Sequence, residues 1–179
     1  MTEVGSVYGE ALYELAKAEG LAKVISQELS VLRESFRQEP EFVRLLSAPN
    51  LSKQERCQIL ENSFRGRLEP YLLNFLKILT EKGYIRHFNY CCDAYMSRFY
   101  EDNNILRVTA ITAVSMTDAQ SSKLREKLSG ITGKKILLDN KVDPSALGGV
   151  RLDYDGRRLD DTVAHRLAAI RQLLNNDVL

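Results

Sequence analysis

Apolar residues in the first hundred positions recur every three or four residues, the spacing that predicts amphipathic helices. The pattern predicts six helical segments with short connections, and Gly20, Pro40 and Gly83 are among the residues that separate them. Ser52 and Glu55 stand three positions apart before an apolar run, which predicts a capping box at a helix start.

From Ile105 the apolar period changes to two, which predicts a half-buried strand. A second capping-box sequence, from Thr117 to Gln120, opens a predicted helix that ends before Gly130. Another strand is expected over residues 136–142. The second part of the chain therefore mixes strands and helices.

The pair Asp155-Gly156 lies between the last two predicted strands, and both positions of a tight hairpin turn favour such residues. Those strands are expected at 150–154 and 157–160, and a final amphipathic helix is expected from about Asp161. The sequence thus predicts two domains. Residues 1–104 should form a mainly α, six-helix bundle, and residues 105–179 a small α/β (α+β) domain.

Charge and composition argue against some classes of function. The chain has 25 Lys and Arg against 24 Asp and Glu, a net charge of +1, so no overall field attracts nucleic acid or an anionic membrane. The longest stretch without charges, residues 108–117, is far shorter than the roughly 20 apolar residues of a membrane span. We therefore expect no nucleic-acid partner and no direct membrane insertion. Glu3 and Glu10 also argue against a transit peptide.

One acidic cluster, Asp153, Asp155, Asp160 and Asp161, could in principle hold a cation or divide acid and base roles. Arginines interleave with these residues, and the turn and helix-start positions favour ion pairing and capping instead. Gly148-Gly149 lacks the remainder of a phosphate-binding motif, which favours a turn or a close backbone approach. No catalytic, cofactor-binding or metal-binding residue is expected.

Two predicted helices have more apolar surface than one core needs. In the helix from Pro70 to Lys82, Tyr71, Leu73 and Ile78 lie off the main apolar stripe. The first helix has a wide stripe, and small residues on its flank would let another helix approach closely. These small residues are Gly5, Gly9 and Ala16. Either the two helices form a groove for a partner helix, or a six-helix bundle buries its central helices on several sides.

Three stretches carry a family resemblance: VYGEALYELA at residues 7–16, LKILTEKGYI at 76–85, and VDPSALGGV at 142–150, followed by LDDTV at 159–163. They resemble the delta subunit of the F-type ATP synthase, which is related to the mitochondrial oligomycin-sensitivity-conferring protein. Arg151, Asp153 and Asp155 depart from the pattern, because family members commonly have apolar residues and a glycine in this segment.

The resemblance implies a non-catalytic peripheral-stalk (stator) subunit that links the catalytic head to the membrane sector and resists rotational torque during ATP synthesis. It implies one copy per complex and no cofactor. The N-terminal bundle would receive the N-terminal helix of an alpha subunit on its first and fifth helices, and the C-terminal domain would meet the b subunits. The corresponding partner-binding residues are Tyr8, Ala11, Leu12, Leu15, Asn74, Ile78 and Glu81.

The implied location is the cytoplasmic face of a bacterial cell membrane, as a peripheral protein, with the stromal face of a plastid thylakoid as the alternative. Two other functions stay open from the residues alone. One is a helical adaptor domain that binds a different amphipathic helix. The other is a small enzyme that uses Asp153, Asp160 and Asp161 with a divalent cation.

Overall fold

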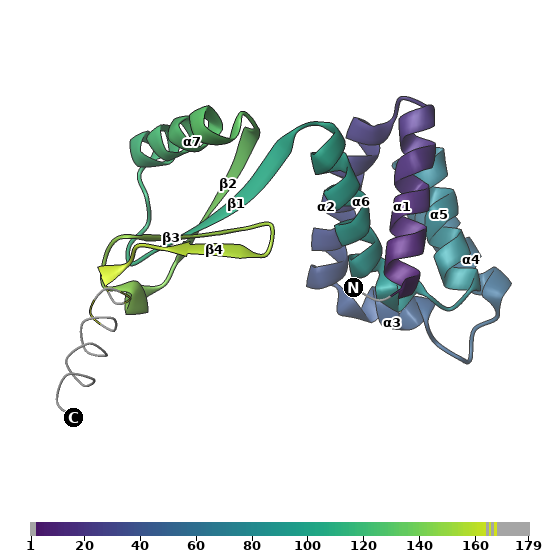
Figure 1. The fold of residues 1–179 in the computed structure, drawn as a ribbon. Helices are drawn as coiled ribbons and strands as arrows, with labels where there is room; N and C mark the ends of the chain where they lie inside the picture. Colours follow the sequence, from purple (N-terminus) through teal and green to yellow (C-terminus); the bar gives the residue numbers. More distant parts are fainter. Residues whose placement is uncertain (1–2, 164, 166, 168–179) are drawn as a thin grey trace. The chain divides into compact units, whose positions relative to one another are not determined.

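A computed structural model describes residues 3–163, 165 and 167 of the chain (Figure 1). Its contacts divide the chain into two compact units, Met1–Phe99 and Tyr100–Leu179. The division falls inside a helix that continues to Asp102, rather than after Asn104.

The first unit is built from α-helices that begin and end near the residues expected from the sequence. Ser52 and Glu55 form the predicted capping box at the start of one helix, and Pro70 opens the next. The stretch at Ile85 differs, because a short 3₁₀ turn precedes the last helix, which begins only at Phe88. The elements are α1 (Glu3–Ala18), α2 (Ala22–Gln38), α3 (Pro40–Leu46), α4 (Lys53–Phe64), α5 (Pro70–Glu81), η1 (Ile85–His87) and α6 (Phe88–Asp102).

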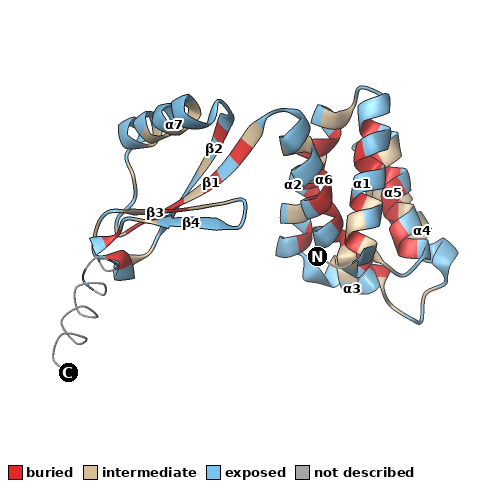
Figure 2. Cartoon of the chain, in the orientation of Figure 1, coloured by how far each residue is buried: buried red, intermediate tan, exposed pale blue. Residues whose placement is uncertain are grey.

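The core of this unit lies between the inward faces of these helices (Figure 2). Tyr13 of α1 and Tyr95 of α6 are fully buried, their rings meet edge to face with centroids 5.3 Å apart, and the Tyr95 hydroxyl donates to the carbonyl of Ala22 at 2.9 Å. A Cβ on Gly9 would lie 2.3 Å from the carbonyl oxygen of Cys91. The small-residue flank of α1 is therefore occupied by the chain's own α6 at Gly9, and it is not open to a partner there.

The second unit contains a four-stranded mixed sheet in the order β2-β1-β3-β4. β1 pairs with β2 in parallel and with β3 antiparallel, and β3 pairs antiparallel with β4. Helix α7 connects the parallel pair and begins at the predicted capping box of Thr117 and Gln120. The elements are β1 (Ile105–Thr112), α7 (Asp118–Thr132), β2 (Lys135–Val142), η2 (Pro144–Ala146), β3 (Val150–Tyr154) and β4 (Arg157–Asp160).

A small apolar core forms where α7 covers one face of this sheet (Figure 1). Leu106, Val108 and Ala110 of β1 alternate inward, and Leu124 and Leu128 of α7 pack against them. The final helix expected from Asp161 lies largely outside the described residues. Helices and a mixed sheet together make the chain an α+β protein.

The two glycine-containing motifs of the second unit have the predicted kind of structure. Asp155 and Gly156 both have positive φ, 45° and 71°, and they connect β3 to β4. Gly149 has a φ of 78°, and a Cβ there would lie 2.4 Å from the carbonyl oxygen of Asp161. The Gly-Gly pair thus permits a close backbone approach, and the N–H of Val163 donates to the Gly148 carbonyl at 3.0 Å.

Candidate partner-binding groove on α1 and α5

Helix α1 has two neighbouring apolar faces, and only one of them is buried in the unit's core. The buried face consists of Gly5, Gly9, Leu12, Tyr13 and Ala16. Next to it, at helical spacing, lies a stripe that stays accessible. Within that stripe the side chains of Val7 and Leu15 are 60% and 41% exposed. The stripe consists of Val4, Val7, Tyr8, Ala11 and Leu15.

Helix α5 likewise has a buried face and an accessible face, and the buried face is the wider of the two. Its buried residues are Leu72, Leu73, Phe75, Leu76, Leu79 and Thr80. Ile78 is 37% exposed, Asn74 is exposed and Tyr71 is half-buried. The bundle therefore buries α5 on several sides, and Leu73, which the sequence placed off the core stripe, belongs to the core. Tyr71 and Ile78 remain as the accessible apolar positions.

Contacts at both ends hold α1 and α5 together as antiparallel neighbours. Near the start of α1, the ring of Tyr8 meets that of Tyr84, just after α5, with centroids 5.8 Å apart. Beyond the end of α1, the Glu19 carboxylate bonds the phenol of Tyr71, in the first turn of α5. The negative charge of Glu19 raises the pKa of Tyr71 above its ordinary value, with desolvation and the hydrogen bond acting in the same direction. The accessible faces of the two helices therefore lie side by side.

The structure brings five of the seven sequence-predicted residues to these accessible faces. They are Tyr8, Ala11, Leu15, Asn74 and Ile78. Leu12 is only 4% exposed and packs in the core, so it supports α1 from beneath the groove. Val4, Val7 and Tyr71 are not among the seven predicted partner-binding residues, although the sequence places Tyr71 off the main apolar stripe. The high exposure of Val7 has no sequence signal beyond its place on the wide stripe.

Glu81 lies on the side of α5 that meets α4. Its carboxylate accepts a hydrogen bond from the Cys57 thiol of α4 at 3.6 Å. Both residues line a polar cavity of about 940 Å³ between the two helices, where Lys77 forms an ion pair with Glu61. Desolvation raises the pKa of Cys57, and the charge of Glu81 adds to that effect. Glu81 is thus at the edge of the groove, already bonded within the unit.

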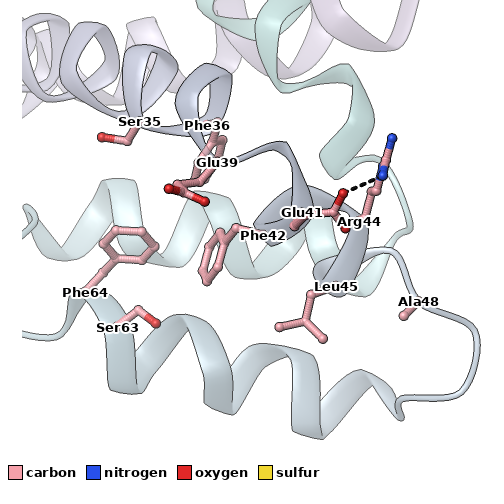
Figure 3. Close-up of a pocket in the computed structure, with 10 residues that line it drawn as sticks. All are labelled: Ser35, Phe36, Glu39, Glu41, Phe42, Arg44, Leu45, Ala48, Ser63 and Phe64. Atoms are coloured by element: carbon pink, nitrogen blue, oxygen red, sulfur yellow. Dashed lines mark hydrogen bonds and ion pairs between the residues drawn. The ribbon is translucent and has the colours of Figure 1, made fainter.

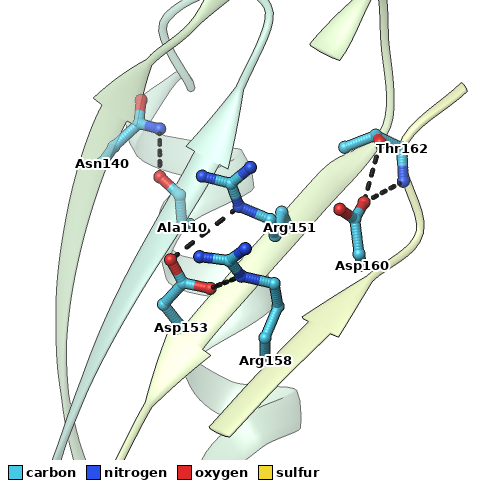
Figure 4. Close-up of polar contacts among 7 residues, drawn as sticks. All are labelled: Ala110, Asn140, Arg151, Asp153, Arg158, Asp160 and Thr162. Atoms are coloured by element: carbon cyan, nitrogen blue, oxygen red, sulfur yellow. Dashed lines mark hydrogen bonds and ion pairs between the residues drawn. The ribbon is translucent and has the colours of Figure 1, made fainter. Parts of the chain in front are cut away.

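Two residues of the acidic cluster, Asp153 and Asp160, are bound by their own neighbours (Figure 4). Asp153 accepts from the Arg158 guanidinium at 2.9 Å, and Arg151 lies 3.8 Å from its other oxygen. Asp160 accepts from the N–H and hydroxyl of Thr162, at 3.0 and 2.7 Å, and both bonds lower its pKa. This is the pairing and capping predicted from the sequence. Within the described part of the chain, no three His, Cys, Asp or Glu residues gather as metal ligands.

A helix that crosses a membrane must be both long and apolar. Among the described residues, none of the helices combines the length and the apolar character that crossing a bilayer requires. The accessible faces of α1 and α5, which we call the groove, combine adjacent helices, exposed apolar side chains and a support of packed helices, and these are properties of a protein-binding surface.

Comparison with known proteins places the chain in a family. The family model "ATP synthase delta (OSCP) subunit" matches residues 4–174. The ATP synthase subunit delta of Alkaliphilus oremlandii is 34% identical, with 96% of each chain covered. That of Lactobacillus gasseri is 31% identical, covering 97% of this chain and 96% of its own length.

A solved structure has the same fold. A chain in the cryo-EM structure of the Toxoplasma gondii mitochondrial ATP synthase hexamer matches with a TM-score of 0.78 at 20% identity, covering 97% of this chain and 98% of its own. The protein is thus of the class found in the peripheral stalk of F-type ATP synthases. It belongs to the ATP synthase delta (OSCP) subunit family.

Proposed function

We propose that this protein is a non-catalytic stator subunit, which links the catalytic head of a rotary ATP synthase to its membrane sector. Family membership supports the assignment, and one observation of the structure carries the proposed contact with the head. That observation is the pair of accessible apolar faces on α1 and α5, held side by side at both ends. The N-terminal helix of an alpha subunit would lie in this groove, on a six-helix bundle formed by α1 to α6.

The groove has the chemistry that such a joint needs. A stator contact must dissociate slowly under load, and burial of apolar side chains around a few central anchors gives slow dissociation. Ile78 and Leu15 offer such anchors, since 37% and 41% of their surfaces are available for burial. Because the groove is already formed by packed helices, a partner helix would bind without reordering it.

The second unit would meet the b subunits. Leu147 is 66% exposed and has a φ of 61°, a left-handed conformation that is uncommon for a leucine. Val163 is 40% exposed, and its backbone pairs with that of Gly148, next to Leu147. Two exposed apolar side chains therefore lie on adjoining segments, as a docking surface for stalk helices requires. One copy of the protein per complex would connect the two contacts at the cytoplasmic face of a bacterial membrane. The bacterial relatives favour that location over the plastid alternative.

Calorimetric titration tests the head contact. Full-length protein would be titrated with a peptide that copies the N-terminal helix of the alpha subunit from the same organism. Ile78→Asp places a charge in the apolar contact, and we expect affinity to fall about thirtyfold or more, corresponding to about 2 kcal/mol. Val31→Asp is the matched control, because Val31 on α2 is 67% exposed and lies outside the groove. It should leave affinity unchanged.

Two other results would change the assignment. A folded protein that does not bind the alpha-subunit peptide would refute the head contact and favour the alternative, an adaptor for another amphipathic helix. Equal losses for Ile78→Asp and Val31→Asp would mean that the peptide binds elsewhere. Leu147→Asp should weaken binding of b-subunit peptides and leave the alpha-subunit peptide unaffected.

A further inference from the structure

A second cavity opens in the first unit between α2, α3 and α4, and α1 and α5 contribute none of its described lining residues (Figure 3). Its volume is about 750 Å³, within the range of about 300–1,000 Å³ found for small-molecule sites. We call it the phenylalanine cavity. Its lining residues are Ser35, Phe36, Glu39, Glu41, Phe42, Arg44, Leu45, Ala48, Ser63 and Phe64.

Three aromatic rings from three helices form one end of the cavity. The centroid of the Phe42 ring lies 5.8 Å from those of both Phe36 and Phe64, and the Phe42 and Phe64 planes are nearly perpendicular, at 88°. Phe36 packs in turn on the buried Phe88, with centroids 5.0 Å apart. The ring cluster is therefore anchored in the core. Leu45, which is 43% exposed, extends the apolar lining toward Ala48.

Among the described lining residues, the rim of the cavity has two carboxylates, Glu39 and Glu41, but only one cation, Arg44. Arg44 forms an ion pair with Glu41, at 2.5 Å, one turn apart on α3. Glu39 occupies the N-cap position of α3, yet its side chain makes no capping hydrogen bond. Within residues 3–163 its carboxylate also has no ion-pair partner. Figure 3 shows this carboxylate at the end of the cavity where the three rings gather.

We infer that the phenylalanine cavity binds a small amphiphile that has an apolar chain or ring and a single ammonium group. Aromatic ring faces attract cations, and an unpaired carboxylate beside them adds Coulomb attraction for the same charge. The apolar part of the ligand would lie along Leu45 and Ala48. An anionic head group would be repelled by the Glu39 carboxylate. Arg44 would not offset this repulsion, because its charge is already neutralised by Glu41. This site goes beyond the proposed stator function and is independent of the groove.

The test compares two probes with the same alkyl chain and opposite charge. Full-length protein would be titrated by calorimetry with octyltrimethylammonium below its micelle concentration, and separately with octanoate. We expect one-to-one binding of the ammonium and at least about fivefold weaker binding of octanoate. Chemical-shift changes in an NMR titration should be confined to the lining residues of α2, α3 and α4.

Two kinds of variant distinguish the contribution of the Glu39 charge to binding from that of the apolar space in the cavity. Glu39→Gln removes the unpaired carboxylate from an exposed position, and it should weaken ammonium binding about fivefold. Glu126→Gln is the matched control: it makes the same change in net charge at an exposed position on α7, in the second unit, and should have no effect. Ala48→Trp places a bulky ring among the lining residues and should abolish binding, while circular dichroism verifies that the helices are intact.

Several outcomes would overturn the inference. These are equal affinity for octanoate, unchanged ammonium affinity in Glu39→Gln, or equal losses in Glu39→Gln and Glu126→Gln. If both probes still bind the Ala48→Trp protein, the binding site likewise lies elsewhere. If both probes fail to bind while a lysine-bearing amphipathic peptide does, the cavity is a protein contact and the small-ligand inference is wrong.

Discussion

Replacing Gly9 by alanine tests the close contact between α1 and α6 in the first unit. The new Cβ would lie 2.3 Å from the carbonyl oxygen of Cys91 and 2.8 Å from the Cβ of Ala94, both on α6. Ordinary van der Waals contact begins near 3.4 Å, so α1 must move away from α6 by roughly 1 Å. The backbone carbonyl cannot rotate away as a flexible side chain would.

Two effects of opposite sign set the magnitude. Alanine is favoured over glycine inside a helix by about 1 kcal/mol. Overpacking in a core costs about 1–3 kcal/mol, and a whole-helix shift that also loosens Leu12 and Tyr13 belongs at the upper end or above it. We therefore expect a net loss of about 2 kcal/mol. In a unit of this size that lowers the melting temperature by about 10 °C.

The assay must assign the loss to the first unit, because two compact units can unfold separately. Urea unfolding followed by circular dichroism gives the free energy, and hydrogen exchange by mass spectrometry locates faster exchange in α1 and α6. Gly130→Ala, in α7, is the control, since no atom lies within 4 Å of the position that a Cβ would take there, and alanine should stabilise the helix by up to about 1 kcal/mol. A Gly9→Ala protein as stable as the unsubstituted one would refute the close approach of α1 to α6.

Three further predictions concern stability. Thr80 is fully buried and its hydroxyl has no hydrogen-bond partner among the described residues, so Thr80→Val should raise the unfolding free energy by about 1 kcal/mol in urea titration. Gly149→Ala should destabilise the second unit far more than Gly156→Ala in thermal melts, because both glycines have positive φ but only the first meets a carbonyl oxygen. Burial raises the pKa of Cys91 to about 11 and of Cys92 to about 12, from 9.0. Their contribution to stability is therefore complete below pH 9 and is lost as pH rises through 11 and 12, and a urea midpoint unchanged between pH 8 and 11 would contradict this.

Local signals predicted much of the fold. The capping boxes at Ser52 and Thr117 act within a few residues, so the helix starts followed from sequence alone. The hairpin at Asp155-Gly156 is equally local. The sequence did not specify which helix approaches Gly9, because a small residue permits close contact without selecting the partner.

The candidate groove was only partly predictable for the same reason. Helical spacing distinguishes faces of one helix, but which face meets the core depends on how all the helices pack. Leu73 and Leu12 are buried by neighbours that lie far away in sequence. Glu81 turns toward Cys57 of α4, a contact between residues 24 positions apart that no local pattern encodes. The unpaired carboxylate of Glu39 likewise emerges only once Arg44 is seen to pair with Glu41.

The glycine contact has a mechanical consequence. A pull applied to the outer face of α1 passes to α6 at Gly9, where a Cβ would lie only 2.3 Å from the carbonyl oxygen of Cys91. Helix α6 ends at Asp102 and β1 begins at Ile105, so only residues 103 and 104 separate them in the chain. Strand β1 is hydrogen-bonded along both edges, to β2 and to β3. Tension entering the first unit thus reaches the interior of the sheet through a very short covalent connection, with little slack to absorb it.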